Sequence, residues 1–152
     1  ACAPYVVKPV YSCSGRGVRF CAAGEPLPPG GAEPAIVQRF VAGDVRTSFT
    51  IAHEGRVQAT IVYRGVVMSG TVAVCFERVP SQPAVERWVE AFVARARWSG
   101  FVSFDFVVDA AGAAHAIECN PRATSGIHFV HPDDLVRAIV QLADSMGILT
   151  IA

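Results

Sequence analysis

Apolar and polar positions alternate in short runs along the first half of the chain, a pattern typical of β-strands. Three such runs fall in the first third, over residues 5–10, 18–21 and 35–41. Three more predict an antiparallel meander, over residues 45–53, 57–64 and 71–79. Turn-forming residues, Gly65 among them, separate the runs of the meander. The pattern therefore favours a strand-rich first half.

The period changes to that of a helix in two later segments. Residues 85–96 carry apolar side chains at helical spacing, with Ser81 as the expected cap and Gly100 as the expected stop. Residues 132–146 follow the same period, and the acidic first turn suits the helix dipole. The buried face of this second helix is expected to comprise Leu135, Val136, Ile139, Val140, Ala143 and Met146. The predicted fold class is α+β, an antiparallel sheet backed by helices.

A hairpin is predicted between these helices, from strands over 101–108 and 113–120. The connection over 109–112 has Asp first and Gly fourth, which is typical of a type I turn. This turn predicts that Val108 faces Ala113 and that Asp105 faces Ala116. Because side chains alternate between the two faces of a strand, one face is expected to be an apolar core face that comprises Phe104, Phe106, Val108, Ile117 and Cys119. The opposite face presents Asp105, Val107, Glu118 and Asn120.

Two carboxylates beside an amide repel each other unless a positive charge lies between them. Oxygen ligands of this kind suit Mg²⁺, which takes one or two carboxylates together with substrate phosphates. Asp105, Glu118 and Asn120 are therefore candidate metal ligands, and Arg122 directly after the strand is a candidate phosphate contact. The alternative is a solvated polar face that carries an incidental acidic pair.

Composition and charge narrow the classes of function. Hydrophobic residues make up 52% of the 152 positions, so the chain can bury a core and is not expected to be disordered. The 13 basic and 13 acidic residues cancel, which disfavours nucleic acid or an acidic membrane surface as a partner. No apolar run is long enough to cross a bilayer. Five cysteines without regular spacing, and no recognisable signal peptide, favour a reduced, cytoplasmic environment.

Lys8 is the only lysine among the 13 basic residues. It lies in a predicted strand before a loop that contains Ser14, Gly15 and Gly17. Backbone N–H groups of such a loop can cradle a phosphate, with the lysine as the counter-charge. The alternative is a simple turn. His128 and His131 lie three residues apart without a further ligand pair, so they favour loop histidines near a substrate cleft over a zinc site.

Together these segments resemble the C-terminal part of an ATP-grasp ligase. The most specific match joins residues 100–112 to residues 116–122, which resemble the hairpin where an acid and a Glu-x-Asn hold Mg²⁺ and an Arg contacts phosphate or the acyl intermediate. Residues 7–12 resemble the strand whose lysine contacts the α- and β-phosphates. The sequence of residues 120–128 is similar to that of ATP-grasp proteins related to the carbamoyl-phosphate synthetase large subunit.

The resemblance also implies nucleotide contacts outside the hairpin. Residues 37–41 resemble the hinge whose backbone recognises the adenine edge. The resemblance therefore implies that the nucleotide is contacted by Gln38, Arg39, Phe40 and Val41. Gln38 stands where the family usually has Glu. Asp44 directly follows Gly43 and is the candidate ribose ligand, although the family's acid lies further from the glycine. Val107 matches the apolar residue beneath the adenine ring.

The implied activity is the ATP- and Mg²⁺-dependent activation of a small-molecule carboxylate as an acyl phosphate, which an amine or thiol then attacks. Mn²⁺ is an alternative ion, and Lys8 and Arg122 are the implied catalytic residues. Residues 1–38 are expected to be part of a small lobe and 39–152 the large lobe. The family's preceding substrate domain and first phosphate-binding lysine have no counterpart here, so a missing N-terminal lobe or partner subunit is expected. The alternatives are a nucleotide-binding module without ligase activity and a β-rich interaction domain.

Overall fold

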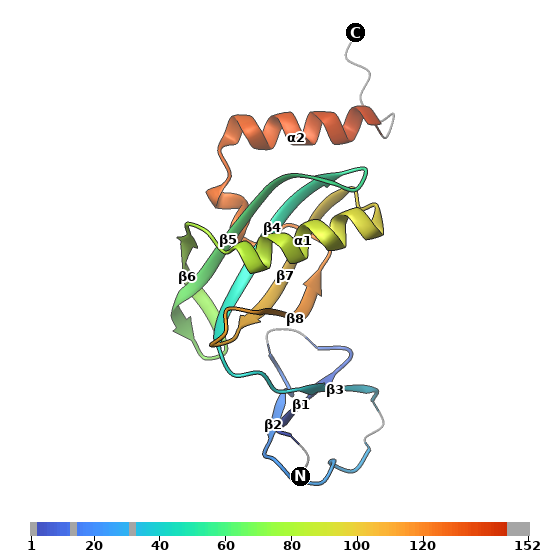
Figure 1. Cartoon of the computed structure of the whole chain (residues 1–152), viewed down its shortest axis with the longest axis vertical. Coiled ribbons are helices and arrows are strands. Elements are labelled where there is room, and N and C mark those ends of the chain that lie inside the picture. Colours follow the sequence, from blue (N-terminus) through green and yellow to red (C-terminus); the bar gives the residue numbers. More distant parts are fainter. Residues whose placement is uncertain (1–2, 13–14, 31–32, 146–152) are drawn as a thin grey trace.

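The computed structural model describes residues 3–12, 15–30 and 33–145. The first strands form a small antiparallel sheet in the order β2-β1-β3, visible at the bottom of Figure 1. Its strands are β1 (Tyr5–Pro9), β2 (Arg19–Cys21) and β3 (Ala35–Arg39). Residues 40–43 then lead directly into a second, larger sheet.

The larger sheet has five antiparallel strands in the order β6-β5-β4-β7-β8. The strands are β4 (Asp44–His53), β5 (Arg56–Ser69), β6 (Val72–Val79), β7 (Gly100–Val108) and β8 (Ala114–Asn120). The predicted α+β class and the predicted strands are confirmed in their main parts. The exception is the turn expected at Gly65, which instead lies inside the long strand β5.

Gly65 is required by packing rather than by a turn. A Cβ built on it would lie 2.6 Å from the Cβ of Ala73 on β6, a separation that real Cβ atoms do not reach. The residue also lies at an irregularity in the β5–β6 pairing. Glycine in a strand commonly marks such a close approach or bulge, and here the sequence pattern alone was misleading.

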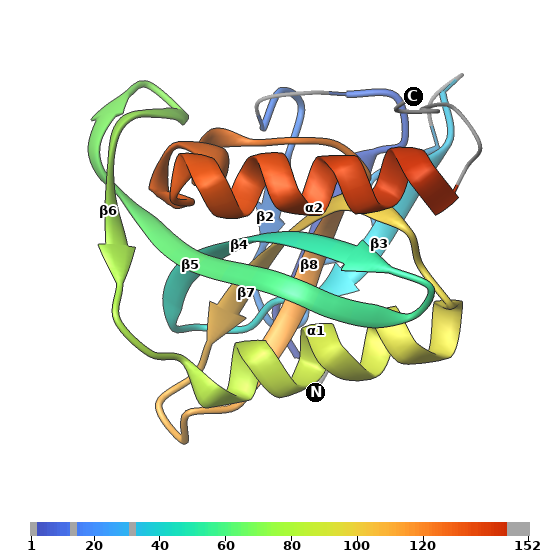
Figure 2. The same cartoon turned by 90° about the horizontal axis from the view of Figure 1, so that it is seen from above.

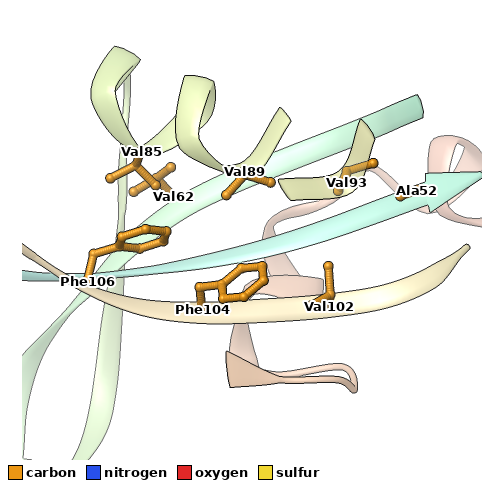
Figure 3. Close-up of a cluster of buried hydrophobic side chains, with 8 residues drawn as sticks. All are labelled: Ala52, Val62, Val85, Val89, Val93, Val102, Phe104 and Phe106. Atoms are coloured by element: carbon orange, nitrogen blue, oxygen red, sulfur yellow. The ribbon is translucent and has the colours of Figure 1, made fainter. Parts of the chain in front are cut away.

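Helix α1 (Pro83–Ala96) covers one face of the large sheet and creates the main core. Figure 3 shows three valines of α1 lying over the sheet, with eight buried side chains in all: Ala52, Val62, Val85, Val89, Val93, Val102, Phe104 and Phe106. The prediction for its ends was wrong in detail. Gln82, rather than Ser81, is the N-cap and makes no side-chain cap, and the helix ends at Ala96, before a left-handed Arg97 rather than at Gly100.

The opposite face is covered by helix α2 (Pro132–Ser145), as Figure 2 shows, and the 3₁₀ helix η1 (Ser125–Phe129) packs against the same cluster of buried residues. The prediction for the buried face of α2 was right for Leu135, which packs against the core, and wrong for Val136 and Ile139. Ala138 and Leu142 are buried, whereas Val136 and Ile139 are 59% and 42% exposed. Met146 lies outside the described residues.

The error on α2 has a geometric cause. Apolar residues extend around half of this helix, so the pattern alone does not say which part meets the sheet. Contact with the sheet falls on the side of Leu135, Ala138 and Leu142, so only one edge of the expected face meets it. Both helices have 14 residues, and within the described part of the chain no helix is long and apolar enough to cross a membrane.

The β7–β8 hairpin forms, but its register differs from the prediction. The turn is confirmed: the N–H of Gly112 donates to the carbonyl of Asp109 at 2.9 Å. Val108 faces Ala114 rather than Ala113. A β-bulge at Ile117 then shifts the pairing, so that Asp105 faces Glu118 rather than Ala116.

The bulge also decides which side chains meet the core. Ala114 and Ala116 pack against it, which the predicted faces had not included. Cys119 lies opposite Phe104, as a core-facing residue would, yet it is exposed. Because β8 is an edge strand with no neighbour on its outer side, a residue on its core face is not necessarily covered. The prediction of a core thiol was therefore wrong.

Candidate functional site

The candidate site lies where β7 and β8 run side by side, on the face of the sheet that α2 and η1 share. Asp105 faces Thr47 on β4 and Glu118 on β8, so these three side chains project from one row of the sheet. Ser103 faces Asn120 in the neighbouring row. The pairing thus brings together the two carboxylates and the amide that the sequence singled out.

Asp105 is half-buried and contacts two of its neighbours in this cluster. Its Oδ1 accepts a hydrogen bond from the Thr47 hydroxyl at 2.7 Å, and its Oδ2 lies 3.4 Å from the Asn120 amide nitrogen. Burial, and then the charge of Glu118, raise the pKa of the Asp105 carboxyl above its ordinary value. The Thr47 hydrogen bond and the charges of Arg122 and Lys8 act in the opposite direction without cancelling the rise. The carboxylate therefore lies in a place that favours an additional positive charge.

Arg122 follows β8 by two residues and folds back over the end of the strand. Its Nη2 lies 3.3 Å from the Asn120 side-chain oxygen, and its Nη1 donates to the carbonyl of Ala123 at 3.2 Å. Its backbone N–H donates to the carbonyl of Asn120 at 2.8 Å, which makes the chain turn sharply there. The guanidinium is exposed and has further N–H groups with which to bind an anion.

Lys8 reaches this cluster from the small sheet. Its ammonium donates to the carbonyl of Ile117 at 2.9 Å, a group that the bulge leaves without a partner residue in the ladder. Lys8 also lowers the pKa of Asp105 through its charge, so the two groups lie within electrostatic range. Residues 109 positions apart in the chain therefore meet at the edge of β8.

The glycine loop connects β1 to β2 in the small sheet and approaches the larger sheet near Thr71. Gly15 and Gly17 both have positive φ, 70° and 72°, which favours glycine. A Cβ on Gly15 would lie 3.6 Å from that of Thr71, in the turn between β5 and β6. Ser14 lies outside the described residues.

The expected adenine-binding hinge begins inside β3 and continues into the connection between the sheets. Gln38 pairs with Val6 and is half-buried, and Arg39 pairs with Tyr5. Phe40 packs edge-on against Phe20, and its N–H bonds to the carbonyl of Pro4. Val41 is half-buried in the connection.

Asp44 and Val107 flank the carboxylates along the strands. Val107 projects from the same face as Asp105, two residues further along β7, and is buried. Asp44 is the first residue of β4 and faces Val108. Its carboxylate is bound by Arg46 at 2.9 Å, so the candidate ribose ligand already has a partner.

A cavity beside α2 is separate from the carboxylates. It has a volume of about 600 Å³, and its lining includes Ile61, His128, His131 and Arg137 but neither Asp105 nor Glu118. Within the described ranges, no three side chains of His, Cys, Asp and Glu cluster as a metal site would require. The zinc alternative thus gains no support from the two loop histidines.

The carboxylate cluster nevertheless fits a magnesium ion that shares its ligands with phosphate. Such a site needs only one or two carboxylates, because phosphate oxygens and water complete the shell. Asp105 is half-buried with a raised pKa, and Glu118 faces it directly, so a divalent cation there would offset two facing charges. The Asn120 amide oxygen is a neutral third donor, at present directed at Arg122.

The fold and the sequence together identify the family to which this chain belongs. The family model described as the ATP-grasp domain matches residues 1–126, and the chain belongs to that family. No curated protein sequence matches the chain.

Solved structures show the same fold. Phosphoribosylamine–glycine ligase from Thermotoga maritima aligns with a TM-score of 0.69 and 16% identity, over 93% of this chain and 44% of that one. D-alanine–D-alanine ligase from Bacillus anthracis, complexed with ATP, aligns with a TM-score of 0.57 and 14% identity, over 94% and 53%. The ATP-grasp ligase PsnB, complexed with minimal precursor, Mg and ADP, gives 0.56 and 16%, over 91% and 47%. The chain thus spans about half the length of each of these ligases.

The hydroxyl of Thr47 at this site was not predicted from the sequence. Thr47 lies in a predicted strand, but its role depends on β4 pairing with β7 across 58 residues of chain. A hydroxyl residue in a strand is too common to be singled out without that pairing. No local motif could have identified it.

Proposed function

We propose that this chain is the nucleotide-binding and phosphoryl-transfer portion of an ATP-grasp ligase, which activates a carboxylate as an acyl phosphate for attack by an amine or thiol. The observation that carries the proposal is the convergence of Lys8, Asp105, Glu118, Asn120 and Arg122 at the edge of β8. Two cations and two carboxylates meeting at one strand end are the groups that a metal-bound triphosphate requires.

In this proposal Asp105, Glu118 and Asn120 hold the metal ion. When bound there, Mg²⁺ would offset the negative charge of phosphoryl transfer. Lys8 would leave the Ile117 carbonyl and pair with phosphate oxygens as a compact charge. Arg122 would bind the phosphate or acyl phosphate with its forked N–H groups. These residues supply positioning and charge, which is most of what phosphoryl transfer needs.

The remaining expectations are part of the same proposal. The adenine would lie near the connection at Gln38–Val41 and over Val107, with residues 1–38 as part of a small lobe and 39–152 as the large lobe. The likeness to the carbamoyl-phosphate synthetase branch also stays a prediction. The substrate-binding half would come from a further lobe or a partner subunit, since the structural neighbours are about twice as long.

Calorimetry with ATP and Mg²⁺ tests the proposal. The chain should bind MgATP, and Asp105→Asn and Glu118→Gln should each remove the magnesium-dependent part of the affinity. Glu77→Gln is the matched control. This exposed acid pairs with Arg64 and lies on β6, the edge strand at the other end of the sheet from β8. No binding at millimolar ATP, or unchanged affinity in both site variants, would sink the proposal.

A nucleotide-binding module without ligase activity is the second candidate, favoured by the half-length match alone. Release of phosphate from MgATP on addition of carboxylate and amine separates the two. Phosphate release that Asp105→Asn abolishes supports a ligase. Binding without turnover, when the remaining half of a ligase is also supplied, supports the module.

A further inference from the structure

Three hydroxyl side chains meet behind Arg122, two of them buried (Tyr63 and Ser103) and one half-buried (Thr124). Tyr63 comes from β5, Ser103 from β7 and Thr124 from the loop that precedes η1. The Tyr63 hydroxyl lies 2.9 Å from Thr124 Oγ1, and Ser103 Oγ lies 2.8 Å from the same oxygen. Ser103 Oγ in turn lies 3.3 Å from the backbone carbonyl oxygen of Arg122. The four groups form an unbroken chain from β5 to the site.

The direction in which these hydroxyls donate their hydrogen bonds is set by the last group of the series, the backbone carbonyl of Arg122. A carbonyl oxygen only accepts, so the Ser103 hydroxyl donates to Arg122. Ser103 then accepts from Thr124, and the Thr124 oxygen accepts from the Tyr63 phenol. Each hydroxyl therefore donates one hydrogen bond in the same direction, an arrangement in which neighbouring bonds reinforce one another.

Burial makes this arrangement costly to break. Ser103 is fully buried and Tyr63 is 3% exposed, so water cannot replace a lost partner. Burial also raises the pKa of the Tyr63 phenol, which keeps its proton available as the first donor of the chain. The hydroxyls hold one another in a single arrangement.

The loop after β8 also packs against the Tyr63 ring at Gly126, two residues after Thr124. Gly126 is buried, and a Cβ on it would lie 2.7 Å from Tyr63 Cε1 and 2.4 Å from Phe49 Cβ. The chain from Arg122 to Gly126 is thus fixed by a carbonyl, by a side chain and by close backbone packing. The guanidinium of Arg122 is left exposed, at the candidate site.

We infer that Tyr63, Thr124 and Ser103 form a hydroxyl relay whose task is to position Arg122 for its contact with phosphate. This inference rests on the proposed function, because it assigns the relay a role through Arg122. The three are positioning residues: they do not touch the nucleotide, and they act by fixing the carbonyl from which the Arg122 side chain departs.

Hydrogen–deuterium exchange on the nucleotide-free chain is the first test. Ser103→Ala and Thr124→Val each break the relay, so exchange should increase at the amides of Arg122 and Ile127, which bond within this loop. Thr124→Ser keeps the hydroxyl and should restore slow exchange. Thr50→Val is the matched control, since it removes a buried hydroxyl pair with Thr60 elsewhere in the sheet and should leave both amides unchanged.

A double-mutant cycle on MgATP affinity is the second test. Ser103→Ala should weaken binding about three- to tenfold, the effect of one hydrogen bond, while Thr50→Val stays within about twofold. In an Arg122→Ala background, Ser103→Ala should cause no further loss, because the relay then has nothing to position.

The outcomes separate this inference from the proposed function. Absence of MgATP binding by the unmodified chain refutes the proposed function, and the relay's role falls with it. If binding is intact but the losses of Ser103→Ala and Arg122→Ala add, or if Arg122→Ala has no effect, only the relay inference is overturned. Unchanged exchange at Arg122 in both relay variants overturns it as well.

Discussion

Replacing Asp105 with Asn is expected to stabilise the fold at neutral pH while it removes the central carboxylate of the candidate site. The pKa of Asp105 is raised, which means that the folded protein favours the neutral form of this carboxyl. Asn has nearly the same shape, and its amide oxygen can still accept the hydrogen bond from Thr47. The substitution therefore removes the charge and little else.

The size of the gain follows from opposing contributions. Favourable cross-strand pairs in a sheet contribute roughly 0.2–1 kcal/mol, and a like-charged pair such as Asp105 and Glu118, which face each other directly, is destabilising instead. Burial of the carboxylate adds to this cost and is the larger cause of the raised pKa. The stronger hydrogen bond that Thr47 gives to a charged acceptor, together with the attraction to Arg122 and Lys8, offsets part of it. We expect a net gain of about 0.5–1 kcal/mol, or roughly 1–4 °C in melting temperature for a chain of this size.

The dependence of this stability gain on pH tests whether ionisation of Asp105 is its cause. The folded-state pKa of Asp105 lies above the unfolded value, so ionisation costs stability at neutral pH. This cost disappears as the pH falls through the folded-state pKa towards the unfolded value of about 3.9. Thermal unfolding of Asp105→Asn and the native chain should thus differ at pH 7 and converge at about pH 4. The exposed Asp133→Asn serves as control and should give no gain. A variant less stable than the native chain at pH 7, or a gain that persists unchanged in acid, refutes the reasoning.

Two further predictions concern packing around the site. Gly126→Ala should lower the free energy of unfolding by about 1–3 kcal/mol in urea denaturation, because the new methyl group overlaps Phe49 and Tyr63. Gly30→Ala, in open space, is its control, and equal stability of the two would contradict the close packing. In α2, Leu142→Ala should destabilise by about 2 kcal/mol or more, whereas Val136→Ala should stay within about 0.5 kcal/mol. The reverse order would mean that the helix packs through the face that the sequence pattern predicted.

Local chemistry made much of this fold predictable from the sequence. The Asp–Gly turn at 109–112 marked the hairpin, and the change from strand to helix period marked α1 and α2. The family resemblance was found on the same hairpin, and the match over residues 1–126 confirms the family. These features depend on residues close together in the chain, where sequence patterns are most informative.

The features that depend on distant partners were not predictable. Thr47 meets Asp105 only because β4 lies between β5 and β7, and the Tyr63–Thr124 bond joins residues 61 positions apart. The exposure of Cys119 depends on β8 being an edge strand, which no local pattern states. In each case the missing information was the order of strands in the sheet rather than the identity of the residues.

The bulge at Ile117 affects both the local register of the hairpin and a contact between distant residues. The register set by the turn, with Val108 facing Ala114, would place Ile117 opposite Asp105 and turn Glu118 towards the core if it continued without interruption. One extra residue restores Glu118 to the face of Asp105, and it also leaves the Ile117 carbonyl free to accept Lys8. A single irregularity thus places the second carboxylate and gives the lysine from the small sheet its contact. Bulges commonly re-aim side chains beside active sites, and here the bulge is what makes the carboxylate cluster possible.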